Sequence, residues 1–159
     1  YYVVNNIRKV LDAEEALKSI QEKDFDPRRE VIVEKDVSLP SRKKRPNVRE
    51  HNGADIQLVS FHPNIIGLQV NTSSTGFLVS TDAYHPGWRA WIDGVEVKVY
   101  RANYAFKGVI VPPGRHKVEF RFVAPGFHEG VLVSLFTLLL LGLFAALFVL
   151  KRMTFTASS

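Results

Sequence analysis

The sequence contains no cysteine, so no disulfide can stabilise any domain that it forms. This absence argues against a small secreted scaffold held together by disulfides. The histidines lack the spacing of metal-binding motifs, and no serine occupies a nucleophile-elbow pattern. We therefore expect no catalytic residue, no metal site and no cofactor within this chain.

A strong excess of positive charge is also lacking. The formal net charge of +5 includes Lys151 and Arg152, and the remainder is too small to indicate nucleic acid as a partner. The basic residues concentrate only at Arg42–Arg45, a run bounded by Pro40 and Pro46. This run is typical of a solvated loop, and the alternative is contact with acidic lipid headgroups or a phosphate-bearing polymer.

One long segment lacks charge altogether. The run from Gly130 to Leu150 is apolar on every side, and as a helix it would be about 32 Å long, close to the ~30 Å of a bilayer core. We predict a transmembrane helix over 130–150. Because Lys151 and Arg152 follow at once, the positive-inside rule places the tail in the cytoplasm and residues 1–129 outside the cell membrane. Phe127 is then expected at headgroup depth.

The N-terminal part predicts one soluble helix. Over residues 12–23, apolar residues recur at helical spacing, Asp12 is suited to the N-cap, and Glu15 occupies the capping-box position. A short strand is expected at Val31–Glu34. The proline- and charge-rich stretch that follows, 38–53, predicts a linker.

From Ala54 onward the hydrophobic period changes to two, with turn residues every eight to twelve positions, which predicts an immunoglobulin-like β-sandwich. Asp93-Gly94 is the strongest hairpin signal, since a type I′ turn requires positive φ at both central residues. The expected hairpin joins strands 88–92 and 95–100 and pairs Ile92 with Val95. One of its faces is apolar and includes Trp88, which we assign to the core.

Trp91 lies on the opposite, charged face of this hairpin, close to Tyr100. Its ring must therefore pack against something that the hairpin does not supply: the second sheet, a neighbouring domain, the membrane interface or a sugar ring. We take Trp91, Tyr100 and Tyr104 as candidate ligand or interface residues. Asn71 begins an N-glycosylation sequon that would lie outside the membrane.

Taken together, these patterns describe a mainly β chain with one short N-terminal helix and one C-terminal transmembrane helix. The first residues already suggest an extended strand, and we expect the chain to be the C-terminal piece of a longer protein. The expected regions are an N-terminal α/β segment (1–37), a linker (38–53), the sandwich (54–124), a juxtamembrane loop (125–129), the membrane helix (130–150) and a cytoplasmic tail (151–159).

The sequence resembles the C-terminal end of YfhO-type bacterial membrane proteins. The resemblance is carried by Tyr84, Pro86-Gly87-Trp88, Asp93-Gly94, the YRAN stretch at 100–103 and VPPGRHKVEFRF at 111–122. It implies a polytopic parent protein that is similar to the glycosyltransferase C superfamily. Such enzymes use polyprenyl-phosphate sugars as donors and glycosylate polymers of the cell envelope. Their acidic catalytic residues belong to a loop that has no counterpart here.

The resemblance thus implies an extracytoplasmic accessory domain and last membrane helix of a lipid-linked-sugar glycosyltransferase. The expected partners are the lipid bilayer, the other membrane helices of the parent chain, and a polyprenyl-phosphate sugar or envelope polymer. The alternative is a single-pass membrane protein whose sandwich binds a protein or glycan partner.

Overall fold

The computed structural model describes residues 1–34 and 54–156, with side chains as far as residue 146. The chain divides into two compact units, Tyr1–Val123 and Ala124–Ser159. The expected linker at 38–53, with its basic run, lies outside the described residues, as do the side chains of Lys151 and Arg152.

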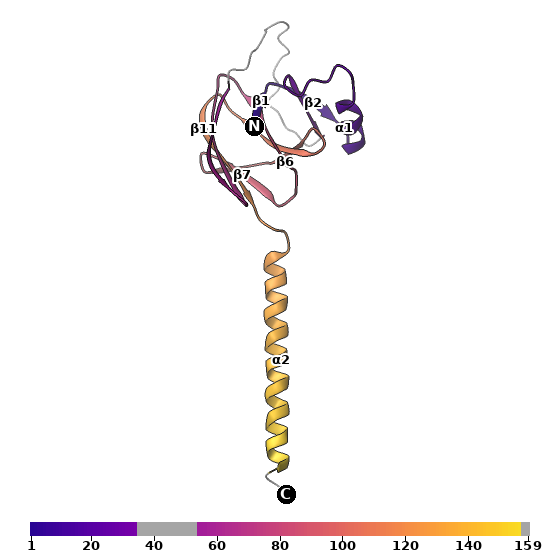
Figure 1. Ribbon diagram of the computed structural model, residues 1–159, viewed down its shortest axis with the longest axis vertical. Coiled ribbons are helices and arrows are strands. Elements are labelled where there is room, and N and C mark those ends of the chain that lie inside the picture. The colour runs from indigo at the N-terminus through magenta and orange to yellow at the C-terminus, as the bar shows by residue number, and fades with distance from the viewer. Residues whose placement is uncertain (35–53, 157–159) are drawn as a thin grey trace. The chain divides into compact units, whose positions relative to one another are not determined.

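The first unit is a two-sheet β-sandwich, which confirms the expected fold class (Figure 1). One sheet has five antiparallel strands with β11 at its centre, so that Val118 pairs with Leu68 on one side and Ile92 on the other. In spatial order these strands are β4 (Asp55–His62), β5 (Ile65–Thr72), β11 (Gly114–Phe122), β7 (Trp88–Ile92) and β8 (Val95–Val97).

The other sheet has six strands and takes in the N-terminal segment. Strand β1 pairs with β6, and β3 joins β9 through Val33 and Ala102, so the β-region extends well before the expected start at Ala54. In spatial order these strands are β1 (Tyr2–Val4), β6 (Gly76–Ala83), β10 (Phe106–Val111), β9 (Tyr100–Ala102), β3 (Glu30–Glu34) and β2 (Asn6–Val10).

The main core lies between the two sheets. Alternation along each strand sends one set of side chains inward, and each fully buried aliphatic or aromatic side chain contributes about 1.5–3 kcal/mol of stabilisation. Trp88 is half-buried against this cluster, as expected for a core residue. The buried members are Val3, Ile66, Leu68, Val70, Leu78, Ala90, Ile92, Val109, Val111, Val118 and Phe120.

Helix α1 (Ala13–Ile20) connects the parallel strands β2 and β3 and packs beside them (Figure 1). Its start is as predicted: Asp12 Oδ1 accepts a hydrogen bond from Glu15 N at 2.9 Å, and Glu15 reaches back to Leu11 N. The helix ends earlier than residue 23. Beyond Gln21 the chain turns, and Phe25 packs on the small cluster that holds Ala16.

The Asp93-Gly94 hairpin is confirmed, with φ of 50° and 86° at the two turn residues and Ile92 paired with Val95. The strand after the turn, however, was predicted wrongly as one element over 95–100. It splits into β8 in the five-stranded sheet and β9 in the six-stranded sheet. Alternation alone cannot reveal this change of sheet, because both halves keep the β-pattern.

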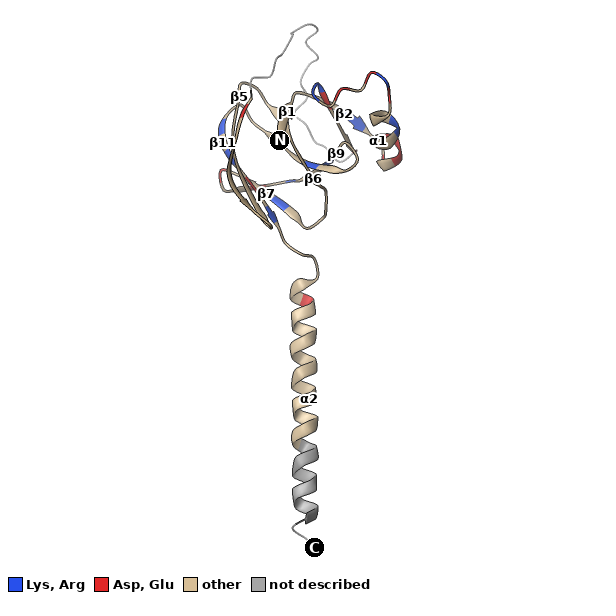
Figure 2. Ribbon diagram, in the orientation of Figure 1, with Lys and Arg blue, Asp and Glu red and all other residues tan. Residues whose placement is uncertain are grey.

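The second unit is helix α2 (Phe127–Thr156). Its segment Phe127–Ala146 has a mean hydropathy of 2.1 and is long and apolar enough to cross a membrane. From Phe127 to Ala146 the sequence of α2 has Glu129 as its one acidic residue and no lysine or arginine, and this stretch is almost wholly uncharged in Figure 2. Ser134 and Thr137 donate their hydroxyls to the carbonyls one turn earlier, each at 2.9 Å, as polar side chains in a lipid environment must.

Candidate functional site

Trp91 lies on the outer face of the five-stranded sheet, away from the core. In register it is flanked by Glu119 of β11 and Glu96 of β8. The neighbouring row of the same two central strands pairs Arg121 with Arg89. We call Trp91, Glu119, Glu96, Arg121 and Arg89 the Trp91 face.

The guanidinium of Arg121 covers the ring of Trp91, with its central carbon 5.0 Å from the ring centroid. A cation over an indole ring is attracted by the negative charge on the ring face, which contributes about 0.5–1 kcal/mol at an exposed site. This stacking identifies what the half-buried Trp91 packs against: a side chain of its own sheet. A flat ligand that stacks on the same side of the ring must displace Arg121.

The charges of the Trp91 face are paired with one another. Glu119 bonds Arg121 and lies 3.8 Å from Lys117 Nζ, while Arg89 and Glu96 are joined at 3.4 Å. Their arginine and lysine side chains are exposed, and water screens such pairs, so they add little to stability. They leave carboxylate oxygens and N–H donors around one aromatic ring, a combination that suits a ligand rich in hydroxyl groups.

Tyr100 and Tyr104 do not belong to the same sheet as Trp91. Tyr100 is in β9, with its ring 6.1 Å from that of Phe77 and packed on the second cluster of the six-stranded sheet. Tyr104 is exposed in the turn between β9 and β10, where its φ is 66°. The change of sheet after β8 separates Tyr100 from the face on which the hairpin pattern had placed it.

Sequence reasoning missed a buried lysine. Lys107 has no exposed side-chain surface, and its Nζ lies 2.9 Å from Asp82 Oδ2 and 3.6 Å from the centre of the Trp88 ring. Strict alternation along β10 gives Lys107 the same orientation as the buried Val109 and Val111, and this pattern could have found it.

The surroundings of this pair shift the pKa values of both Lys107 and Asp82. Burial lowers the pKa of Lys107 because it disfavours the ammonium, and Asp82 counteracts only part of that effect. Burial by itself would raise the pKa of Asp82. Hydrogen bonds from Ser80 Oγ, at 2.6 Å, and from Lys107 outweigh it, so the pKa of Asp82 is lowered. The short distance between Lys107 Nζ and Asp82 Oδ2, 2.9 Å, is that of an ion pair.

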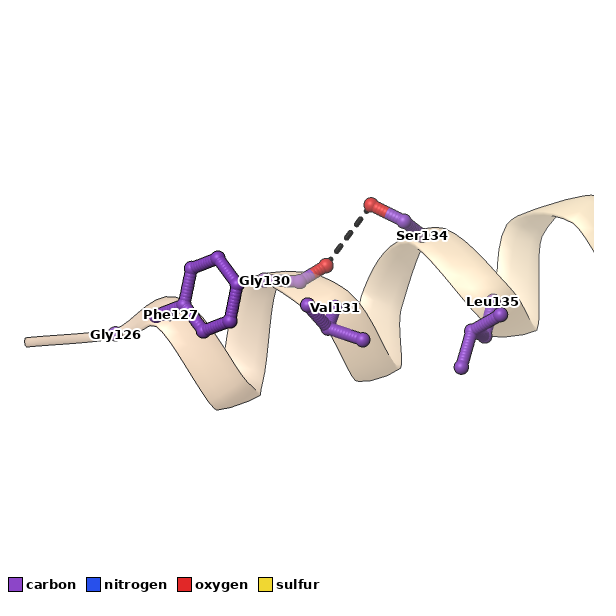
Figure 3. A pocket seen from close by; sticks show the side chains of 6 residues that line it. All are labelled: Gly126, Phe127, Gly130, Val131, Ser134 and Leu135. Carbon is purple, nitrogen blue, oxygen red and sulfur yellow. Dashed lines mark hydrogen bonds between the residues drawn. The ribbon is translucent and has the colours of Figure 1, made fainter. Parts of the chain in front are cut away.

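In the part of the chain that the structure describes, no three histidine, aspartate or glutamate side chains gather in a way that could hold a metal ion. A shallow hollow lies along the first turns of α2, beside Phe127 (Figure 3). The hydroxyl of Ser134 at its edge donates its hydrogen to Gly130 O, so it has no further hydrogen to donate to a ligand. The lining residues are Gly126, Phe127, Gly130, Val131, Ser134 and Leu135.

Comparison with known proteins gives one family. Residues 37–134 match the family model described as bacterial membrane protein YfhO. The chain is also 27% identical over 94 residues to an uncharacterized protein named YfhO from Bacillus subtilis (strain 168), a match that covers 59% of this chain and 10% of the relative. The chain thus spans about a tenth of that relative's length. No solved structure matches it.

Proposed function

This chain belongs to the YfhO family of bacterial membrane proteins, and from that premise we propose that it is the extracytoplasmic accessory domain, with an attached membrane helix, of a longer glycosyltransferase. The parent enzyme would transfer sugar from a polyprenyl-phosphate donor to a polymer of the cell envelope. We assign the chain itself no catalytic step. Its role would be to cover the membrane active site and to guide the acceptor.

The observation that carries this proposal is the extent of the family match. It extends from residue 37 over strands β4 to β11 and into the first turns of α2, which supports a β-domain followed closely by a membrane helix as a shared feature of the family. The small share of the relative that the chain covers is consistent with a larger parent protein. A β-domain whose last strand ends only a few residues before a membrane helix would be well placed to act on a reaction at the membrane surface.

The Trp91 face is the best candidate for contact with the acceptor. It combines an aromatic ring with paired carboxylates and guanidinium groups, and sugars bind proteins through both stacking and hydrogen bonds. In this proposal Arg121 moves aside when a sugar ring stacks on Trp91, and the charged neighbours then bond the sugar hydroxyls.

Sugar transfer by the intact parent protein tests the role of the domain. Deleting residues 1–123 should abolish transfer to the envelope polymer. Trp91→Ala should reduce transfer on the order of tenfold, equivalent to ~1.4 kcal/mol of lost binding. The matched control is Val95→Ser, which changes an exposed side chain of the same sheet and should have no effect. Unchanged transfer after the deletion would contradict the proposal.

The orientation can be tested separately, because the absence of cysteine allows single thiols to be introduced. A membrane-impermeant maleimide applied to intact cells should label Val95→Cys, whereas Ser158→Cys should react only after lysis. The reverse pattern would place the sandwich in the cytoplasm and would remove an envelope polymer from the candidate acceptors.

A further inference from the structure

Three turns of the sandwich gather around the end of β11, the strand that leads towards α2. Phe122 N donates to Asn64 O and Val123 N to Gly87 O, each at 2.8 Å. Tyr84 N donates to Ala105 O at the same distance. These bonds tie the turns 62–64, 84–87 and 103–105 into one end of the first unit. We call this end the turn end; it comprises the three turns and the adjoining residues Phe61, Ile65 and Val123.

The turn end exposes apolar and aromatic side chains. Phe61 is 65% exposed, Val123 44%, Tyr104 40% and Ile65 38%. None of its three turns contains an acidic residue, and two of them carry an exposed histidine. Exposed side chains of this kind, clustered at one end of a domain, mark a surface that contacts something other than water.

Chain length limits how far this end can lie from the membrane helix. Strand β11 ends at Phe122 and α2 begins at Phe127. Even fully extended, the chain between these residues spans at most about 18 Å. The other end of β11, at Gly114, lies about 27 Å further along the strand. If α2 crosses the bilayer, the turn end is therefore the part of the sandwich that must remain near the lipid surface.

We propose that the turn end contacts the headgroup layer of the bilayer, with Phe61 and Tyr104 inserted among the lipids. Aromatic side chains are favoured at membrane–water interfaces, where an apolar ring and a polar group find suitable surroundings at once. The lack of acidic residues in the turns avoids repulsion by anionic lipids, which give a membrane a negative surface. This inference rests on the part of the proposed function in which α2 spans the membrane.

The experiment uses the complete chain in vesicles of phosphatidylcholine and phosphatidylglycerol. Single cysteines at Phe61→Cys and Tyr104→Cys carry an environment-sensitive fluorophore, and spin-labelled lipids near the headgroups act as quenchers. The matched control is Ser73→Cys, at an exposed position in the turn after β5. The last residue of β5, Thr72, pairs with Gly114, so Ser73 lies at the opposite end of β11 from the turn end. We expect blue-shifted emission at positions 61 and 104, with quenching at least severalfold stronger than at 73. Equal, water-like emission at all three positions would overturn the inference.

Two further measurements distinguish contact with lipid from a failure of α2 to insert and from contact with a second copy of the chain. Treating the vesicles with alkaline carbonate tests separately whether α2 is inserted. Extraction of the chain would overturn both this inference and the proposed function. If the chain stays in the vesicles but quenching is equal at positions 61, 104 and 73, this inference alone is overturned. Adding lipid at a constant amount of protein shows whether lipid or a second copy of the chain covers the turn end. A fluorescence shift that disappears on dilution would mean that a second copy, and not lipid, covers the turn end. A shift that persists supports lipid.

Discussion

Asn103 takes the place of a strand residue opposite Ile32. Its backbone N donates to Ile32 O at 2.8 Å, and its side-chain Oδ1 accepts from Ile32 N at 2.8 Å. Its Nδ2 donates to the Tyr2 hydroxyl at 3.2 Å. One buried side chain thus joins the turn after β9 to both β3 and β1, and it ties the N-terminal strands to the rest of the sandwich.

Replacing Asn103 with glycine should therefore destabilise the sandwich. Glycine tolerates the φ of 47° at this position, so the change removes the side-chain hydrogen bonds without adding backbone strain. Leaving the buried Ile32 N–H without a partner should cost about 1–3 kcal/mol. Urea unfolding followed by tryptophan fluorescence measures this loss in the free energy of unfolding. Tyr2→Phe removes only the weaker contact and should cost clearly less; equal losses for both variants would contradict the assignment.

The two partners of the buried ion pair should respond unequally to mutation. Asp82→Asn leaves the fully buried Lys107 ammonium without a counter-charge, at a cost of about 3 kcal/mol. Lys107→Met should cost less, because Asp82 is 41% exposed and can be hydrated, and the methionine still fills the space beside Trp88. The unfolding free energies of the two variants decide the question. A larger loss for Lys107→Met would show that the pair is stabilised mainly by the lysine's own contacts.

The pH dependence of Asp82→Asn provides a check. Burial lowers the pKa of Lys107 in the folded state, so the unfolded chain holds the proton more tightly. Stability must then rise with pH between the folded pKa and the unfolded value of about 10.4. Without Asp82 the folded pKa of Lys107 falls further, so the variant begins to gain stability at a lower pH than the natural sequence does. The stability deficit of Asp82→Asn should therefore narrow as the pH rises from the folded Lys107 pKa of the variant to that of the natural sequence, and a deficit that stays constant with pH would contradict the assignment.

His116 should make the sandwich less stable as the pH rises through neutrality. Its Nδ1 lies 2.6 Å from Asp93 Oδ2 and its Nε2 lies 3.2 Å from Pro113 O. Both neighbours are acceptors, and only the protonated ring donates from both nitrogens. The hydrogen bond to Asp93 raises the pKa of His116 accordingly.

Because the folded pKa of His116 exceeds the unfolded value of about 6.5, its stabilising contribution is complete below that pH and is lost as the pH rises through the folded pKa. Thermal unfolding between about pH 6 and 9 should show this loss in the natural sequence and a flatter profile in His116→Gln. Parallel profiles would show that the ring is neutral. The pKa of Asp93 is lowered by the same hydrogen bond, so its own contribution disappears only in acid.

Gly108 should tolerate alanine less well than Gly94 does. A Cβ at Gly108 would overlap the ring of Phe77 and come within 2.5 Å of Leu78 O, and that carbonyl is fixed by the pairing of β6 with β10. Overpacking of this kind costs about 1–3 kcal/mol or more. At Gly94 a Cβ meets nothing within 4 Å, so Gly94→Ala suffers only the strain of a φ of 86°, about 1 kcal/mol. The urea midpoints of Gly108→Ala and Gly94→Ala measure this difference in stability. A lower midpoint for Gly94→Ala than for Gly108→Ala would contradict the prediction.

Local chemistry in the sequence is sufficient to predict several elements. Asp12 and Glu15 define the start of α1, and Asp93-Gly94 defines the hairpin and its pairing, because both depend on residues only a few positions apart. The apolar run after Phe127 is equally local, since a helix in lipid satisfies its own hydrogen bonds. These features needed no knowledge of the rest of the fold.

The tertiary structure decided what depends on distant partners. The chain passes from one sheet to the other between β8 and β9, which separates Tyr100 from Trp91, although the alternation of residues continues across that point. Arg121 covers Trp91 because β11 and β7 pair in one particular register. Lys107 is buried because Asp82 and Trp88 come from other strands to meet its charge. Such contacts depend on which strands pair, on their register and on how the two sheets pack, none of which is specified by periodicity along a single strand.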